Sequence, residues 1–565
     1  MMTVNGRRLT RQRLSRRTLL RAASLGGAMG VVAIAGCGGR NPKNRSSQRG
    51  ASSSVAGKPT PGGRFVLNVN NDPFDWDLSY VGKTLPNSNG IALAYESLLT
   101  DKRGPDVKYG DLLLQPLLAQ RWESPDPQTF TFHLRPNVKF ANLAPVNGRL
   151  LTSTDVRWSY EYWSRTGDFT GKNLPKGQFD WFFEGLDAVQ TPDPSTAVVR
   201  FKQPFAPFLN YAASDFNPIV PHELYDHYGT LQDHMAGTGP WQLDTEASQK
   251  GSKWVWKKNP TYWDQGKPYL DEIDWLVLAD TTTALSAFRT KQLDRLGGDI
   301  LSCQQANELK QTDPSATEFS YPQPAWEMYM NLSTHPLNDE RLRKAIGFSI
   351  DRDAFISSLD CGQGGWGLAG AFPTTFTQEE IKQVVHYDPQ QAKQLLKAAG
   401  FGEGLDLEFI YPGKEYGDTY IAEMQLLQAQ LKKTGINLNL KSIDKSDFSK
   451  SKKTYKFTMT IQGKGDLFGD VDSYLFATFY SKSKANYGQV NDAELDRMIL
   501  AQRRELDPTK RTQLVKDAIR YINEHALGLS IESRSQFEFV ASSVKNYAPQ
   551  FGVHGIPQVD TWIQK

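Results

Sequence analysis

The chain contains few residues whose types and spacing suit chemistry. The run Gly362–Gly367 (GQGGWG) formally fits the G-x-G-x-x-G pattern of a nucleotide-binding turn, but no clear strand precedes it and no helical pattern follows. We therefore interpret it as a glycine-rich turn or a loop beside a hinge. His222, His227 and His234 lie close together, yet a proline and a glycine interrupt this segment, which favours a solvated helix and loop over a metal site.

Catalytic motifs are missing from the sequence. It contains no H-E-x-x-H, no G-x-S-x-G and no Walker A pattern. Asp72, Asp75 and Asp77 form an acidic group, but aspartate is ordinary in a turn-like run. Cys303 and Cys361 lie far apart in the sequence, which leaves open whether they form a disulfide or remain two buried free thiols. With 13 Trp and 22 Tyr as contact surface, the pattern favours a binding protein without a cofactor over an enzyme.

The elements that must position these residues alternate between strand and helix. Leu405–Phe409 and Ile436–Leu440 both alternate with period two, as half-buried strands do. Between them, apolar residues from Tyr420 to Leu431 recur at three- and four-residue steps, which predicts a helix that Gly435 ends. The sequence therefore predicts a right-handed βαβ unit with parallel strands and an α/β fold class.

Other parts of the chain differ from this unit. A chain of 565 residues is too long for one ordinary core. Arg64–Val69 reads as the first strand of the folded body. Short aromatic strands such as Phe130–Leu134 indicate a mixed domain inserted between Asp101 and Pro221, and Asp507–Pro508 begins a late helix.

The net charge of +3 is unevenly distributed. Residues 1–36 carry seven arginines and no acidic residue, and without them acidic residues outnumber basic ones. Ser15–Arg21 resembles a twin-arginine export signal, and the apolar run that follows is too short to span a bilayer. Ile34–Cys37 resembles a lipobox, which implies cleavage before Cys37 and lipidation of its thiol. Residues 37–62 read as a flexible tether, and no basic stripe indicates a nucleic-acid partner.

Several further segments, taken in order, resemble one family. The resemblance rests on Tyr95–Leu98, Pro116–Glu123, Thr129–Arg135, Leu151–Val156, Gly237–Trp241, Asn259–Trp263, Lys267–Ile273 and Asp339–Ala345. Together they resemble the extracytoplasmic solute-binding proteins of ABC importers, family 5, which includes oligopeptide-, dipeptide- and nickel-binding proteins.

The resemblance implies two α/β lobes of the periplasmic-binding-protein fold (type II), joined by a hinge, with an extra mixed α/β domain on the first lobe. It implies the following limits: residues 63–96, 221–325 and 536–565 for the first lobe, 97–220 for the extra domain and 326–535 for the second lobe.

The same resemblance implies a lipid-anchored, monomeric binding protein outside the cytoplasm. It would capture peptides between its closing lobes and deliver them to a membrane permease driven by an ATPase. An oligosaccharide or a metal chelate is the alternative ligand, and a secreted lipoprotein hydrolase is the alternative class of protein.

Ligand-binding residues follow from the resemblance as candidates only. In peptide-binding members an aspartate pairs with the amino terminus of the peptide, and this chain departs from their pattern around that position. The candidates are Asp466, Asp470 and Asp472 for that role, Asn70, Asn71 and Asp72 after the first strand, and Trp326 and Tyr329 at the entry to the second lobe. The alternatives are turn- or helix-capping for the acidic residues and core or hinge packing for the aromatic ones.

Overall fold

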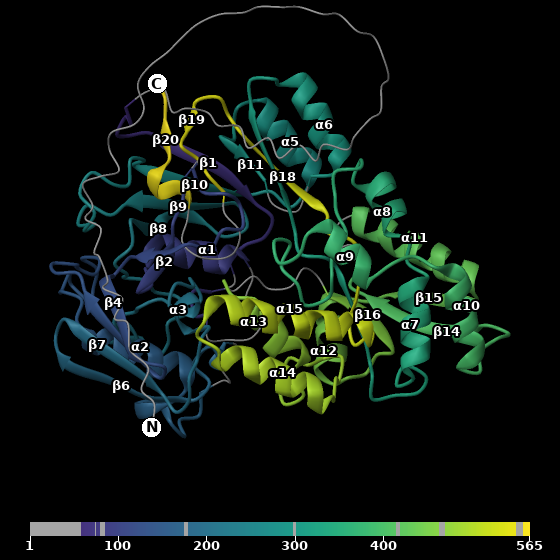
Figure 1. Ribbon diagram of the computed structural model, residues 1–565. Helices are drawn as coiled ribbons and strands as arrows, with labels where there is room; N and C mark the ends of the chain where they lie inside the picture. Colours follow the sequence, from purple (N-terminus) through teal and green to yellow (C-terminus); the bar gives the residue numbers. More distant parts are fainter. Residues whose placement is uncertain are drawn as a thin grey trace, which may run out of the picture. The chain divides into compact units, whose positions relative to one another are not determined.

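The structure is a computed structural model, and it describes residues 58–565 apart from 74, 79–84, 105, 175–178, 298–300, 414–417, 463–468 and 550–556. The predicted export segment, Cys37 and Asp466 lie outside the described residues. The described chain forms three large sheets with helices packed against them (Figure 1). None of the described helices is long and apolar enough to cross a membrane.

The first sheet has seven strands in the order β12-β18-β11-β1-β10-β9-β8. Its strands are β1 (Arg64–Val69), β8 (Trp241–Gln249), β9 (Lys253–Lys258), β10 (Glu272–Val277), β11 (Arg295–Leu296), β12 (Thr317–Pro322) and β18 (Ser535–Val540). β1 is parallel to β10 and β11, as an α/β lobe requires. On one side, α5 (Thr281–Arg289) and α6 (Cys303–Thr312) form a core with Val66 and Phe537. We call this sheet and its helices the first lobe.

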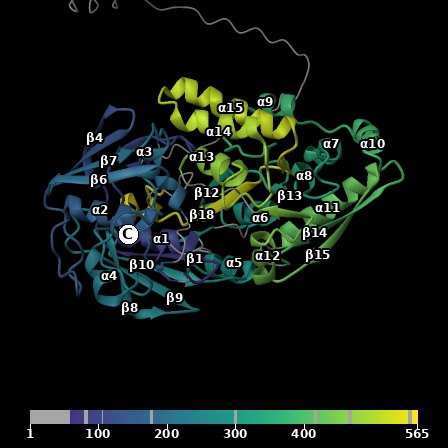
Figure 2. The same ribbon diagram turned by 90° about the horizontal axis from the view of Figure 1, so that it is seen from below.

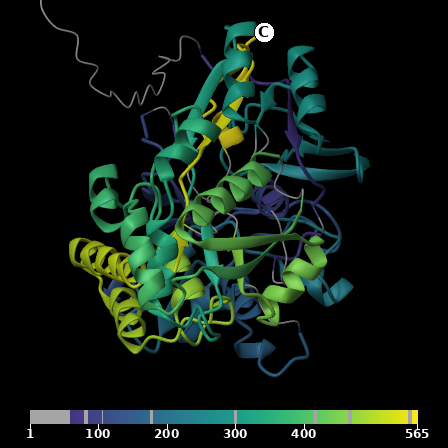
Figure 3. The same cartoon turned by 90° about the vertical axis from the view of Figure 1, so that its right-hand side faces the viewer.

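The second sheet has five strands in the order β15-β14-β16-β13-β17. They are β13 (Glu327–Met330), β14 (Leu405–Tyr411), β15 (Ile436–Ser442), β16 (Met459–Gln462) and β17 (Leu529–Ser530). One face packs on α7 (Glu340–Phe348), α8 (Arg352–Leu359), α10 (Pro389–Ala398) and α11 (Asp418–Thr434) (Figure 3). β14 and β15 are parallel and α11 connects them, which confirms the predicted βαβ unit.

A neighbouring core completes this second lobe. It is built from α9 (Gln378–Val384), α14 (Ala493–Arg504), α15 (Pro508–Glu524) and the π-helix η3 (Leu475–Phe479), which follows the short helix α13 (Asp472–Tyr474). Leu332 packs against both cores and so joins them. The opposite face of the second sheet is covered by α12 (Lys445–Lys453) through Phe448.

The third sheet is antiparallel and lies within the predicted extra domain. Its order is β4-β5-β7-β6, with β4 (Ala119–Asp126), β5 (Thr129–Leu134), β6 (Leu186–Asp193) and β7 (Thr196–Phe201). Helix α2 (Ser153–Ser164) packs on it, and α3 (Phe208–Tyr211), α4 (His222–Tyr228) and the strands β2 (Leu99–Asp101) and β3 (Leu114–Pro116) lie around it. Helix α1 (Leu85–Ala94) packs instead on β8 of the first sheet. Phe132 and Tyr160 of this region share one continuous core with Phe65 and Trp256 of the first lobe. The third sheet is therefore fused to the first lobe by packing, and the predicted domain limits remain predictions.

Candidate ligand site at a hinge between two lobes

Two chain segments connect the first and second lobes. Residues 323–326 lead from β12 to β13, and residues 531–534 lead from β17 to β18. They run antiparallel, because Gln323 N donates to Arg534 O at 2.9 Å and Ile531 N donates to Trp326 O at 2.9 Å. This pair of strand-like crossings is the hinge.

The glycine-rich run lies directly against this hinge. Gly365 and Ser533 exchange two backbone hydrogen bonds of 2.8 Å. A Cβ atom on Gly367 would lie 2.4 Å from the Cβ of Ala325 on the other crossing, so only glycine fits there. This confirms the interpretation of Gly362–Gly367 as a loop beside a hinge.

A disulfide joins the lobes next to the same crossings. Cys303 begins α6 in the core of the first lobe, and Cys361 follows α8 in the second lobe. The two sulfurs are bonded, with 5.9 Å between the Cα atoms. The pairing that the sequence left open is therefore present, and it adds a third covalent connection between the lobes.

Strand register shows which edge of each sheet lies at the hinge. Glu327, the first residue of β13, pairs with Gln462, the last residue of β16. Because β16, β14 and β15 are mutually parallel, their carboxyl ends all lie on the hinge side of the second sheet. In the first sheet, β18 leaves the hinge at Ser535 and runs antiparallel to β11, which is parallel to β1. The carboxyl end of β1 therefore also points toward the hinge.

Ligands of open α/β sheets bind beyond the carboxyl ends of the parallel strands. In the second lobe a hollow of about 570 Å³ lies at the ends of β14 and β15, with Gly413, Ser442, Asp444 and Lys445 among its lining residues. In the first lobe, the predicted residues Asn70, Asn71 and Asp72 directly follow β1. In both lobes, the sheet edge on which such folds bind ligands therefore faces the hinge.

The candidates after β1 are accessible to different extents. Asn71 is exposed, while Asn70 and Asp72 are half-buried. Asp72 Oδ1 accepts hydrogen bonds from Gly251 N at 3.0 Å and from Trp254 Nε1 at 2.8 Å. These two bonds fix the carboxylate on the first lobe.

Trp326 and Tyr329 are both buried. Trp326 packs in the core of the second lobe, with its ring 5.2 Å from that of Tyr420. Tyr329 belongs to the small cluster around Phe448 on the opposite face of the sheet. Packing roles are thus evident for both aromatic residues, and a ligand contact by either one stays a prediction.

Asp470 and Asp472 both lie in an ionic cluster. Asp470 accepts from Arg511 Nη1 at 2.8 Å, from Arg511 Nη2 at 2.6 Å and from Asn210 Nδ2 at 2.6 Å. Burial acts to raise the pKa of Asp470, but the Arg511 guanidinium overrides it and holds the pKa below its ordinary value. Asp472 accepts from Tyr211 Oη at 2.7 Å and forms an ion pair with Arg503 Nε at 3.1 Å. Every carboxylate oxygen of the two residues has a protein partner. A ligand contact by either residue stays a prediction.

Sequence reasoning missed the buried acidic residues around the hinge. Glu532 lies on one crossing, and Glu423 of α11 faces it. Burial, and next the charge of Glu423, raise the pKa of Glu532 well above its ordinary value. Arg534 Nε lies 3.0 Å from Glu423, and burial raises the pKa of the nearby Asp360 to about 6. The one feature of the sequence that could have indicated a buried acidic residue is Glu423, which lies among the regularly spaced apolar residues of a predicted helix.

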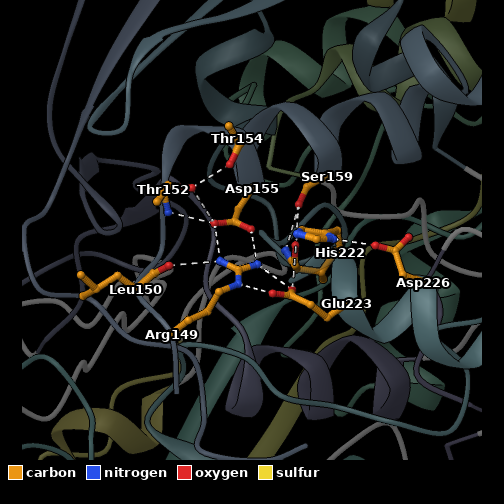
Figure 4. Close-up of polar contacts among 10 residues, drawn as sticks. Arg149, Leu150, Thr152, Thr154, Asp155, Ser159, His222, Glu223 and Asp226 are labelled. Carbon is orange, nitrogen blue, oxygen red and sulfur yellow. Dashed lines mark hydrogen bonds and ion pairs between the residues drawn. The ribbon is translucent and has the colours of Figure 1, made fainter. Parts of the chain in front are cut away.

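A second polar cluster, away from these strand ends, bears on the hydrolase alternative (Figure 4). Arg149 bridges Asp155, at 2.7 and 2.9 Å, and Glu223 of α4. His222 Nδ1 lies 2.7 Å from Asp226, while Ser159 Oγ donates to the carbonyl oxygen of Val220. No hydrogen bond among the described residues joins Ser159 to His222. The serine and the histidine of this cluster therefore do not form a nucleophile–base pair. Within the described ranges, no group of three or more metal-ligating side chains is arranged to hold a metal ion.

Two α/β lobes that meet at paired hinge crossings define a two-lobed periplasmic-binding-protein fold. The chain belongs to the bacterial extracellular solute-binding proteins, family 5, whose model matches residues 114–486.

Known relatives agree with this assignment. The dipeptide-binding protein of Escherichia coli (strain K12) is 27% identical over 465 residues, which cover 78% of this chain and 85% of the relative. Heme-binding protein A of Haemophilus influenzae is 24% identical over 463 residues, covering 78% and 83%. The structure of the periplasmic binding protein DppA from Helicobacter pylori in complex with the peptide STSA superposes with a TM-score of 0.76 at 22% identity, covering 90% of this chain and 99% of that one.

Proposed function

We propose that this protein is the substrate-binding component of an ABC importer and that it captures peptides between its two lobes. The observation that carries the proposal is that, in each lobe, the carboxyl ends of the parallel strands point toward the same hinge. Ligand bound there would contact both lobes at once, so binding would favour the closed arrangement. The closed protein would then deliver the peptide to a membrane permease driven by an ATPase.

The anchoring part of the proposal rests on the sequence. Lipidation at Cys37 and the tether up to residue 62 would hold the body at a membrane surface outside the cytoplasm. The disulfide supports this location, because disulfides persist in oxidising compartments. We propose a monomer that acts without a cofactor and without catalysis.

For ligand contacts we propose Asn70, Asn71 and Asp72 on the first lobe and Asp466 on the second. The first three follow a parallel strand at the hinge edge. Asp466 follows β16, whose carboxyl end lies at the same edge. An aspartate paired with the ammonium group of a peptide forms a strong, charge-assisted hydrogen bond.

Peptide is favoured as the ligand because the relatives include a dipeptide-binding protein and a structure with a bound peptide. A metal chelate is the second candidate, since a heme-binding protein is a relative of similar identity. These two ligand classes differ in mass and absorbance, so one experiment separates them.

The test is native mass spectrometry of the oxidised body after purification from an extracytoplasmic fraction. We expect adducts with peptide masses, released on denaturation. Asp72→Asn and Asp466→Asn should then weaken binding of a synthetic tetrapeptide pool about tenfold each, measured by calorimetry. The matched control is Asp406→Asn on the exposed side of β14, which should bind normally. An adduct with porphyrin mass and absorbance, or failure of every peptide in the pool to bind, would refute the peptide assignment.

A further inference from the structure

The region around the third sheet also contacts the second lobe. Ala206, next to α3, donates its backbone N–H to the carbonyl oxygen of Arg503 in α14 at 2.7 Å. Trp181, in the short 3₁₀ helix η2 (Asp180–Phe183), packs against both the core of the first lobe and that of α14 and α15. Figures 1 and 2 both show α3 beside α13. The lobes are thus joined at a contact separate from the hinge crossings.

Arg503 is central to this contact. Its side chain is only 5% exposed and reaches out of α14 toward the region of the third sheet. It forms an ion pair with Glu184 and donates to the carbonyl oxygen of Trp181 at 3.2 Å. Its guanidinium lies 4.8 Å from the ring centre of Phe205 and 3.6 Å from that of Phe476. One buried cation therefore holds groups from both sides of the contact.

Two further pairs cross the same contact. Tyr211 Oη donates to Asp472, and Asn210 Nδ2 donates to Asp470. Burial and the charge of Asp472 raise the pKa of Tyr211 well above its ordinary value, so the hydroxyl keeps the proton that it donates. We refer to the set Glu184, Asn210, Tyr211, Asp470, Asp472 and Arg503 as the clasp.

The distribution of hydrophobic cores shows what happens to the clasp when the lobes separate. Tyr211 belongs to the continuous core that the third sheet shares with the first lobe. Phe476, next to Arg503, belongs to a core of the second lobe. The two halves of the clasp therefore belong to different lobes, and a rotation about the crossings 323–326 and 531–534 that moves these halves apart breaks its hydrogen bonds and ion pairs.

We propose that the clasp residues act as positioning residues for ligand capture, stabilising the closed arrangement through contacts between the lobes. This proposal rests on the proposed function, since it concerns closure around a ligand. A contact formed only in the closed state shifts the open–closed equilibrium and so raises the apparent affinity for any ligand that needs closure. Its charged residues regain water on opening, which keeps the contact reversible.

The test uses the full folded body and two substitutions. Tyr211→Phe removes one hydroxyl and keeps the ring in its core, and Glu184→Gln removes the partner charge of Arg503. The matched control is Lys484→Met, which breaks the ion pair with Asp180 at the exposed rim of the same contact, where Lys484 is 67% exposed.

The first measurement is amide hydrogen exchange of the ligand-free protein. We expect the Ala206 amide to exchange about tenfold faster in both variants, while the Ala212 amide, which donates to Phe208 O at the end of α3, keeps its wild-type rate. The control variant should match the wild type at both amides. Equal Ala206 rates in the wild type and both variants would overturn the proposal.

The second measurement is the dissociation rate of a synthetic tetrapeptide pool. We expect three- to tenfold faster dissociation from Tyr211→Phe and Glu184→Gln, and little change in association. An unchanged dissociation rate in both variants would also overturn the proposal. If no peptide binds the wild-type protein, the proposed function fails, while the ligand-free exchange rates still decide whether the clasp opens.

Discussion

Cys361, the second residue after α8 of the second lobe, is bonded to Cys303, the residue that begins α6 in the first lobe. The bond lies beside the crossings 323–326 and 531–534, because Asp360 Oδ2 accepts from the backbone N–H of Ser535 at the start of β18. The lobes are therefore held covalently at three places on one side, and non-covalently by the clasp.

Removing the disulfide should lower the stability of the folded chain. The bond joins residues 58 positions apart, and restricting a loop of that length in the unfolded state corresponds to roughly 4 kcal/mol at most. We expect Cys303→Ser/Cys361→Ser to lower the free energy of unfolding in urea by about 2–4 kcal/mol. A reductant should lower the wild-type midpoint similarly and leave the double variant unchanged. Equal midpoints with and without reductant in the wild type would contradict the pairing.

Glu327 should make stability depend on pH. Burial raises the pKa of Glu327 to about 8, from an ordinary value of 4.5. The folded state thus binds more protons than the unfolded state between these values, so this contribution is fully present below pH 4.5 and is lost as the pH rises through about 8. The full loss corresponds to about 5 kcal/mol as an upper limit.

Glu327→Gln replaces the protonated acid by a neutral group of the same shape. We expect it to be more stable than the wild type at pH 8.5 but not at pH 5, in urea unfolding curves. The control is Glu408→Gln on the exposed side of β14, which should show no such crossover. Parallel pH profiles for Glu327→Gln and the wild type would disprove the assignment.

Arg149 should stabilise the region of the third sheet through its bridge between Asp155 and Glu223 (Figure 4). Asp155 is fully buried, so truncating Arg149 leaves a carboxylate without its countercharge. We expect Arg149→Met to lower the free energy of unfolding by about 2–3 kcal/mol, measured in urea. Arg121→Met, which breaks an exposed ion pair with Glu123, should change it by less than about 0.5 kcal/mol. Similar effects of the two substitutions would show that Arg149 contributes no more than a surface charge.

Gly367 should tolerate no side chain. An added Cβ would meet Ala325 at 2.4 Å, so Gly367→Ala must push the glycine-rich loop away from the hinge crossing. We expect a loss of about 1–3 kcal/mol in thermal or urea unfolding. Gly362→Asn is the control, because its Cβ meets open space and asparagine accepts the φ of 75° there. Wild-type stability of Gly367→Ala would mean that the loop and the crossing are not in fixed contact.

The spacing of apolar residues along the sequence allowed strands and helices to be predicted. It did not predict which residues far apart in the sequence come into contact. Period-two alternation placed Leu405–Phe409 and Ile436–Leu440 in parallel strands, as β14 and β15 confirm. The order of motifs indicated the two-lobed fold. The partners of Tyr211 and Cys303 lie 261 and 58 residues away, and no periodicity encodes such a meeting.

The candidate site was predictable only where it follows a strand. Asn70–Asp72 could be placed because a strand ends just before them. The partners of Asp472 and Asp470 could not, because burial of a carboxylate and the approach of Arg503 or Arg511 depend on the packing of separate helices. For the same reason Glu532 and Glu423 were not recognised as a buried pair.

The position of β18 sets an order of assembly during synthesis. This strand, Ser535–Val540, lies between β12 and β11 inside the first sheet, whereas the second sheet needs only residues from 327 to 530. A chain emerging from the ribosome therefore presents every strand of the second sheet before the first sheet can close. Until β18 arrives, β11 and β12 each keep an unpaired edge. The first lobe is thus begun earliest along the chain and completed last.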